Sequence, residues 1–154
     1  MGTSFSEIFD LFMQQLSDYR LIDLYNTPTT GISNFETYLT GFLILATRGF
    51  DPCTQNLSDR NDSSKEFNFI MTEINKIILS KFMVKEWLGK EVNDILQMRL
   101  HVQDDDFKTF AEANNLNAKK SSYDKLNEDC SQAMVDYGFK NLDWASWFAG
   151  NFVG

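Results

Sequence analysis

The most apolar segment of the chain, residues 72–88, carries hydrophobic side chains around most of a helical circumference. Its apolar residues are Ile74, Ile77, Ile78, Leu79, Phe82, Met83, Val84, Trp87 and Leu88. A surface helix has a single apolar stripe, whereas a helix that is apolar on nearly all sides must be buried. Thr72 suits the N-cap of a helix, and Gly89 suits the position that ends one. The pattern therefore predicts a buried central helix, bounded by Thr72 and Gly89, against which the other helices pack.

Two amphipathic helices are predicted before this segment. Ser4 with Glu7, and Ser33 with Glu36, have the spacing of capping boxes, in which each side chain accepts a hydrogen bond from the backbone of the other residue. Apolar residues then recur every three or four positions, and Gly49 follows the second run. The predicted helices are residues 4–19 and 34–48.

The segments around these helices have the composition of loops. Residues 21–32 and 51–65 contain proline and clusters of polar residues, which favour turns and irregular structure. We expect the second of these to be a surface loop, followed by a short extended piece near residues 67–70.

Two or three further helices are predicted after the central one. A weaker apolar pattern over residues 90–102 indicates a short helix, and the aspartates at 104–106 precede an apolar run, as is typical of a helix start. A last long helix begins at Asn117 or Ser121 and is ended by Gly138. Its apolar stripe consists of Tyr123, Leu126, Cys130, Ala133, Met134 and Tyr137.

Together these patterns predict an all-α fold. We expect a single-domain helical bundle of five to six helices around a buried central helix (residues 1–139), followed by an extended aromatic segment (residues 140–154), here called the C-terminal tail. A chain of 154 residues with 43% hydrophobic residues can bury a core without metal or disulfide support. Cys53 and Cys130 have no partner spacing, and the chain begins without a secretory-signal pattern, so we expect free, buried thiols in a cytoplasm-like compartment.

The charge of the chain excludes some classes of partner. It has 14 basic and 22 acidic residues, which gives a net charge of −8 at pH 7. A negative field repels phosphate backbones and anionic lipids, and no clustered basic stripe opposes it. No apolar run has the length of a membrane span. We therefore expect no direct sequence-specific nucleic-acid binding and no membrane association.

Candidate catalytic and metal-binding residues are few. His101 is the single histidine, and no serine or cysteine near it has the setting of a nucleophile. The aspartates at 104–106 are explained by a helix start. Residues 59–63 have part of the ligand spacing of a calcium loop, but Ser64 stands where that loop requires glycine. With no phosphate loop, zinc motif or dinucleotide fingerprint, we expect no enzyme, no cofactor and no metal.

The C-terminal tail is the strongest candidate for function. Trp144, Trp147, Phe148 and Phe152 place four large rings within nine residues. A solvated chain end rarely exposes that much apolar surface. The rings either dock on the chain's own core or anchor it to a neighbouring protein, as aromatic hot spots do. We predict these four as protein-binding residues.

Four segments resemble small proteins encoded among the virion genes of tailed bacteriophages of low-GC gut bacteria. They are LSDRNDSSKEFNF, ILSKFMVKEWLGKEVN, DDFKTFAEANNL and AMVDYGF, and the resemblance covers roughly residues 4–139. In its short capped helices, acidic surface and protruding tail the chain is similar to head-to-tail connector (neck adaptor) proteins, which assemble as rings below the portal. The sequence after Phe139 departs from this pattern, so the resemblance assigns no partner to the C-terminal tail.

The resemblance implies a non-enzymatic structural component of the virion, assembled in the host cytoplasm. Such a protein would form a homo-oligomeric ring and contact portal or phage-tail proteins, and it would need no cofactor. The alternative is a small cytoplasmic interaction protein, such as an adaptor or inhibitor, that acts as a monomer or dimer. Neighbouring portal, capsid and tail genes would favour the first class, and early regulatory genes would favour the second.

Overall fold

The structure is a computed structural model that describes residues 2–16, 32–101, 108–143 and 145–146. These residues form four helices and a small three-stranded sheet. The helices are α1 (Phe5–Gln14), α3 (Ile32–Gly49), α4 (Glu73–His101) and α5 (Lys108–Lys140). The strands are β1 (Thr3–Ser4), β2 (Arg60–Asn61) and β3 (Glu66–Phe67). The helical class is confirmed, but the described residues do not form five to six helices, and the sheet was not predicted.

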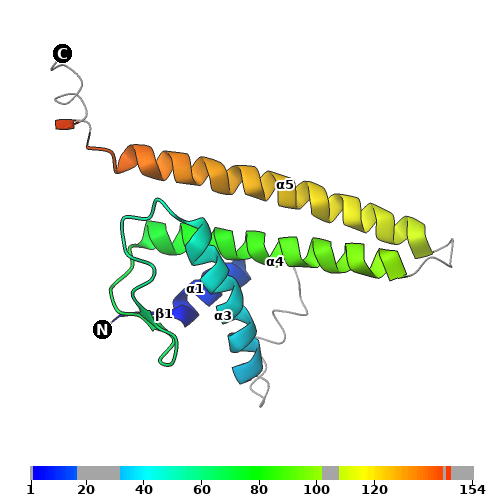
Figure 1. Cartoon of the computed structure of the whole chain (residues 1–154), viewed down its shortest axis with the longest axis horizontal. Coiled ribbons are helices and arrows are strands. Elements are labelled where there is room, and N and C mark those ends of the chain that lie inside the picture. The colour runs from blue at the N-terminus through cyan, green and yellow to red at the C-terminus, as the bar shows by residue number, and fades with distance from the viewer. Residues whose placement is uncertain (1, 17–31, 102–107, 144, 147–154) are drawn as a thin grey trace.

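Helix α4 is the centre of the fold (Figure 1). Helices α1, α3 and α5 each pack against it. Figure 1 shows α5 running antiparallel along α4, while α1 and α3 cover the N-terminal half of α4 from the other side. The predicted role of this helix as the common packing partner is therefore confirmed.

Burial along α4 follows the predicted pattern in most places. The predicted apolar residues from position 78 to position 88 are buried, and Thr72 caps the helix by accepting a bond from Asn75 N at 3.4 Å. Ile74 and Ile77, however, are 47% and 43% exposed. The prediction that Ile74 and Ile77 are buried is therefore wrong, because the three neighbouring helices leave one sector of α4 uncovered in its first two turns.

Gly89 does not end the central helix. It lies inside α4, which continues to His101, and it does not adopt the left-handed conformation of a helix end. A Cβ atom at this position would lie 3.0 Å from Cε2 of Tyr123 on α5. Gly49, which does end α3, would in the same way place a Cβ atom 2.7 Å from Cδ1 of Phe82. Gly89 therefore lets the Tyr123 ring of α5 approach α4 closely, and Gly49 lets the Phe82 ring of α4 approach the end of α3.

The C-terminal half of the described chain is one long helix, not two. Helix α5 runs from Lys108 to Lys140 without a break at Asn117 or Ser121. No glycine or proline occurs between residues 108 and 137, so no helix-breaking residue interrupts α5. The predicted stripe faces the core as expected, with Cys130 and Tyr137 buried and its other aromatic and aliphatic members partly buried. The aspartates at 104–106 lie outside the described residues.

The N-terminal elements agree with the predictions except at their ends. The Ser4–Glu7 capping box is present, but α1 ends at Gln14 with Gln15 as its C-cap, before the predicted end at residue 19. Helix α3 begins at Ile32, so Ser33 lies within its first turn and is not the residue before it. Strand β3 confirms an extended piece beginning at Glu66, and it pairs antiparallel with both β1 and β2.

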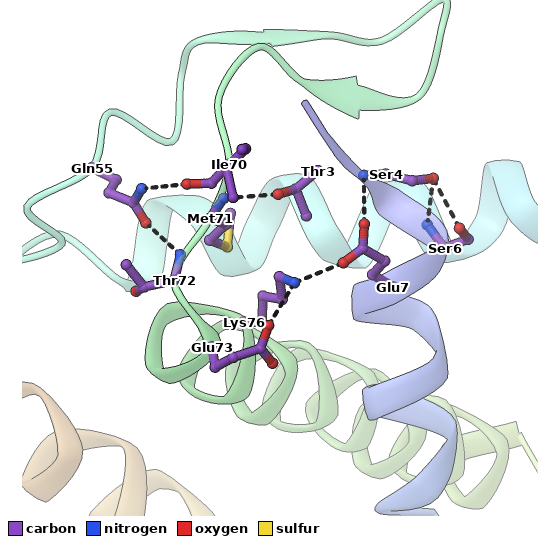
Figure 2. A network of polar contacts seen from close by, with 10 residues as sticks. All are labelled: Thr3, Ser4, Ser6, Glu7, Gln55, Ile70, Met71, Thr72, Glu73 and Lys76. Atoms are coloured by element: carbon purple, nitrogen blue, oxygen red, sulfur yellow. Dashed lines mark hydrogen bonds and ion pairs between the residues drawn. The ribbon is translucent and has the colours of Figure 1, made fainter. Parts of the chain in front are cut away.

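A polar network fixes the start of α4 to the N-terminus of the chain (Figure 2). Lys76 Nζ lies 2.7 Å from Glu7 Oε2 of α1 and 2.8 Å from Glu73 Oε1, and its side chain is 11% exposed. The backbone N–H of Met71 donates to Thr3 Oγ1 at 2.7 Å. These contacts hold β1, α1 and α4 in one arrangement.

Gln55 connects the loop after α3 to the same region. Its Oε1 accepts bonds from Thr72 N at 3.0 Å and from Asn75 Nδ2 at 2.7 Å. Its Nε2 donates to Ile70 O at 2.9 Å. The backbone around Ile70 is therefore held in place even though the Ile70 side chain points into water and is 74% exposed.

Replacing Phe82 by Ala should lower the free energy of unfolding by about 3–5 kcal/mol, because a buried ring would leave a cavity. Phe82 is 1% exposed and stacks on Phe50 with ring centroids 6.0 Å apart. Ile77→Ala, on the same helix but half exposed, is the matched control and should cost about 1 kcal/mol or less. Urea unfolding followed by circular dichroism measures both, and equal costs for the two variants would contradict the assignment of the core.

The Glu7–Lys76 pair should make the fold sensitive to acid. The hydrogen bond from Lys76 is the main cause that lowers the pKa of Glu7 from its ordinary value of 4.5. A carboxylate whose pKa is lower in the folded state stabilises the fold above the unfolded pKa, and this contribution disappears as the pH falls through the folded pKa. The stability lost in Glu7→Gln should therefore be constant above about pH 5.5 and shrink below pH 4.5.

The control for this prediction is a double-mutant cycle with Lys76→Gln. In the Lys76→Gln background, Glu7→Gln should cost less and depend less on pH, because only the capping-box bond from Ser4 N to Glu7 Oε1 remains. A coupling between the two residues that is the same at pH 3 and pH 7 would show that the ion pair is not its source.

Candidate protein-binding surface

A shallow groove lies where α4 begins and α5 ends. Its volume is about 170 Å³. The residues that line it follow one face of each helix, at successive positions of the form i, i+3, i+4 and i+7. They are Ile74, Ile77, Ile78 and Lys81 of α4, and Ala133, Asp136, Tyr137 and Lys140 of α5. We call this surface the α4–α5 groove.

The groove has a buried floor and apolar walls that are open to water. Ile78 and Tyr137 are buried, whereas Ile74 and Ile77 are nearly half exposed. Isoleucine on a solvated helix face contributes nothing to solubility, and contiguous exposed apolar surface is typical of a contact site for another molecule. The groove is therefore the best candidate for a binding surface among the residues that the structure describes.

Tyr137 fixes the floor of the groove to the loop after α3. Its hydroxyl forms hydrogen bonds with Thr54 Oγ1 at 2.7 Å and with Thr54 N at 3.2 Å. Its ring meets Phe50 edge to face, with centroids 5.0 Å apart. These contacts join α5 to the loop after α3 and hold the floor of the groove in place.

The electrostatics of the groove differ from those of the whole chain. Two of its lining residues, Lys81 and Lys140, are basic and one, Asp136, is acidic. The chain as a whole carries a net charge of −8. The groove is thus a locally basic, apolar place on an acidic protein, which favours a ligand that has apolar groups and no positive charge.

A second hollow, of about 210 Å³, lies beside the loop after α3. It is lined by Thr47, Phe50, Asp51, Cys53, Gln55, Asn56, Leu57 and Ser58. Both hollows are smaller than the roughly 300–1,000 Å³ of typical small-molecule sites. Neither has the size of a metabolite site, although the α4–α5 groove has room for a side chain of a partner.

The cysteines are free, as predicted, and neither is set up as a nucleophile. Cys130 is buried, but Cys53 is only partly buried. Burial is the main cause that raises the pKa of both thiols above their ordinary value. A raised pKa disfavours the thiolate, which is the reactive form.

The other sequence candidates do not form a site in the described residues. His101 is the last residue of α4, and its side chain lies outside the description, as do the aspartates at 104–106. In the loop that resembles part of a calcium site, Asn61 Oδ1 instead accepts bonds from the backbone of Ser63 and Ser64. Within the described ranges no three His, Cys, Asp or Glu side chains cluster to hold a metal ion.

The four predicted protein-binding residues, Trp144, Trp147, Phe148 and Phe152, lie outside the described residues. The residues that lead to them, at positions 141–143, are exposed. Ile74 and Ile77, which the structure adds to the candidate surface, were predicted as core. Nothing in the sequence signals that these isoleucines are exposed, because their exposure depends on which sector of α4 the neighbouring helices leave open.

Comparison with protein-family models, with curated proteins and with solved structures finds no match in any of the three. None of the described helices combines the length and the apolar composition that crossing a membrane requires.

Removing the hydroxyl of Tyr137 should loosen the groove floor without emptying the core. Tyr137→Phe should lower the free energy of unfolding by about 0.5–1.5 kcal/mol, because it breaks the bonds to Thr54 and leaves the ring in place. Tyr137→Ala, which also removes the ring, should cost several times more. Thermal unfolding measures both, and a Phe variant that melts like the parent would show that the hydroxyl bonds are not what holds the loop.

Proposed function

We propose that the chain is a non-enzymatic structural component of a tailed-phage virion, a ring-forming head-to-tail connector or neck protein that docks on portal or phage-tail proteins through its C-terminal tail. The observation that carries the binding part of this proposal is the exposed apolar α4–α5 groove beside the start of that tail. The sequence resemblance described above supports the virion part.

The size of the aromatic surface supports a protein partner. Each aromatic side chain can bury roughly 150–250 Å², so the four rings of the C-terminal tail can together bury roughly 600–1,000 Å². One partner of a standard protein interface contributes about 800 Å². The tail alone therefore carries enough apolar surface to anchor a subunit.

The shape of the helical pair supports a structural role. Helices α4 and α5 have 29 and 33 residues, which correspond to lengths of roughly 43 and 50 Å. Figure 1 shows that this pair extends well beyond the part covered by α1 and α3. A long antiparallel pair presents lateral surface to neighbours on either side, as subunits in an assembly require.

The aromatic residues of the C-terminal tail should be needed for assembly and not for folding. A full-length variant with Trp144, Trp147, Phe148 and Phe152 all changed to Ser should lose self-association and binding to portal, while its helical far-UV signal and melting temperature stay close to those of the parent. Val135→Ser, at an exposed position of α5, is the control and should assemble normally. Sedimentation velocity, and electron microscopy of mixtures with portal, measure the result.

Two outcomes would contradict the proposal. A serine variant that unfolds would show that the rings belong to the protein's own core. A parent that remains monomeric or dimeric with portal present, and binds an unrelated host protein, would instead be an adaptor or inhibitor.

A further inference from the structure

The chain leaves the α4–α5 groove in a defined direction. Asn141 follows the last residue of α5, and its backbone N–H and its Nδ2 both donate to Tyr137 O, at 3.2 and 2.8 Å. Asp143 Oδ1 then accepts bonds from Ala145 N at 3.1 Å and Ser146 N at 3.3 Å, which starts a new turn. Figure 1 shows these residues continuing past the end of α5, away from α4. The described start of the C-terminal tail therefore points away from the chain's own groove.

The sequence of the tail matches the chemistry of the groove. Residues 144–154 contain no Asp, Glu, Lys or Arg. A segment of this kind enters an apolar groove without the cost of desolvating a charge. The walls at Ile74 and Ile77 offer apolar contact to an aromatic ring, and the ammonium groups of Lys81 and Lys140 are of the type that binds ring faces. Two lysines against one aspartate in the lining reduce the charge repulsion between acidic copies at this place.

From these observations we infer that the α4–α5 groove of one copy is the receptor for the aromatic C-terminal tail of a second copy. This inference rests on the proposed ring assembly: it gives the tail a second copy as a partner within the ring, beside the portal or phage-tail proteins of the proposed function. The groove and the tail are different surfaces of the same chain, so the contact is heterologous. Repeated from copy to copy, such contacts close into a ring or grow into a filament.

The test uses two full-length variants that each lack one half of the contact. The groove variant carries Ile74→Glu and Ile77→Glu, and the tail variant carries Ser at positions 144, 147, 148 and 152. Each alone should stay monomeric under conditions in which the parent assembles. Mixed, they should form a 1:1 dimer and nothing larger, because only the groove of the tail variant and the tail of the groove variant remain functional. Native mass spectrometry and sedimentation velocity count the copies.

The matched control for the groove variant is Leu45→Glu with Leu96→Glu. These leucines are 43% and 42% exposed, close to the exposure of the two isoleucines, but lie outside the groove. The control should assemble like the parent. Far-UV circular dichroism confirms that each variant is folded before it is mixed.

The outcomes separate this inference from the proposed function. A folded groove variant that assembles like the parent, while the tail variant does not, overturns the groove as receptor and leaves the proposed function standing. A parent that is monomeric, and whose tryptophan emission shifts to the red in the groove variant, shows that the tail occupies its own groove and overturns the second copy as partner. A monomeric parent without that shift overturns both, since the remaining tryptophan, Trp87, is buried and reports no change.

Discussion

The fold depends on the burial of one helix by three others. Each of α1, α3 and α5 packs on α4, so the position of α4 determines the position of the rest. Two places make this packing close: Gly49 admits the ring of Phe82, and Gly89 admits the ring of Tyr123, because neither glycine has a Cβ atom to hold the neighbour away. Polar contacts also hold the start of α4. Lys76 bonds to Glu7 of α1, and Gln55 accepts a bond from the backbone N–H of Thr72, which directly precedes α4. Apolar burial supplies the stability of this arrangement, and the polar contacts make its N-terminal end specific.

Three neighbouring helices do not cover α4 completely, and the uncovered sector is where the candidate surface lies. A solvated sector can carry any polar residue without cost to the fold, yet the chain has Ile74 and Ile77 there and Ile70 just before them. On the adjoining face of α5, Tyr137 is buried and hydrogen-bonded, which gives the groove a fixed floor. An apolar wall above a hydrogen-bonded floor is typical of a binding surface.

The sequence was informative wherever a local rule decides the structure. The Ser4 and Thr72 caps, the apolar stripe that ends at Tyr137 and the burial of Phe82 all follow from contacts within a few residues or from strong periodicity. It was misleading where the reason lies in another element. Glycine is typical of a helix end, so Gly89 was predicted to end α4. The ring that requires a glycine there belongs to Tyr123, which is 34 positions away, so only the folded chain shows the reason. The exposure of Ile77 likewise depends on how many helices surround α4. The aromatic residues predicted for binding lie outside the described chain, so the site that can be described is one that periodicity assigned to the core.

The proposed contact between tail and groove has a consequence for when assembly occurs. A groove of about 170 Å³ has room for about one aromatic side chain, and burying one ring supplies at most roughly 4–6 kcal/mol, from 150–250 Å² at about 25 cal/mol per Å². Bringing two copies together costs an estimated 4–15 kcal/mol, and ordering the tail costs more. A single contact is therefore weak, which is compatible with copies that stay apart at low concentration despite an open groove. In a closed ring every copy makes two such contacts, and a partner that holds several copies raises their effective concentration. Under this proposal assembly is cooperative, because the second contact of each copy exists only once its other neighbour is in place.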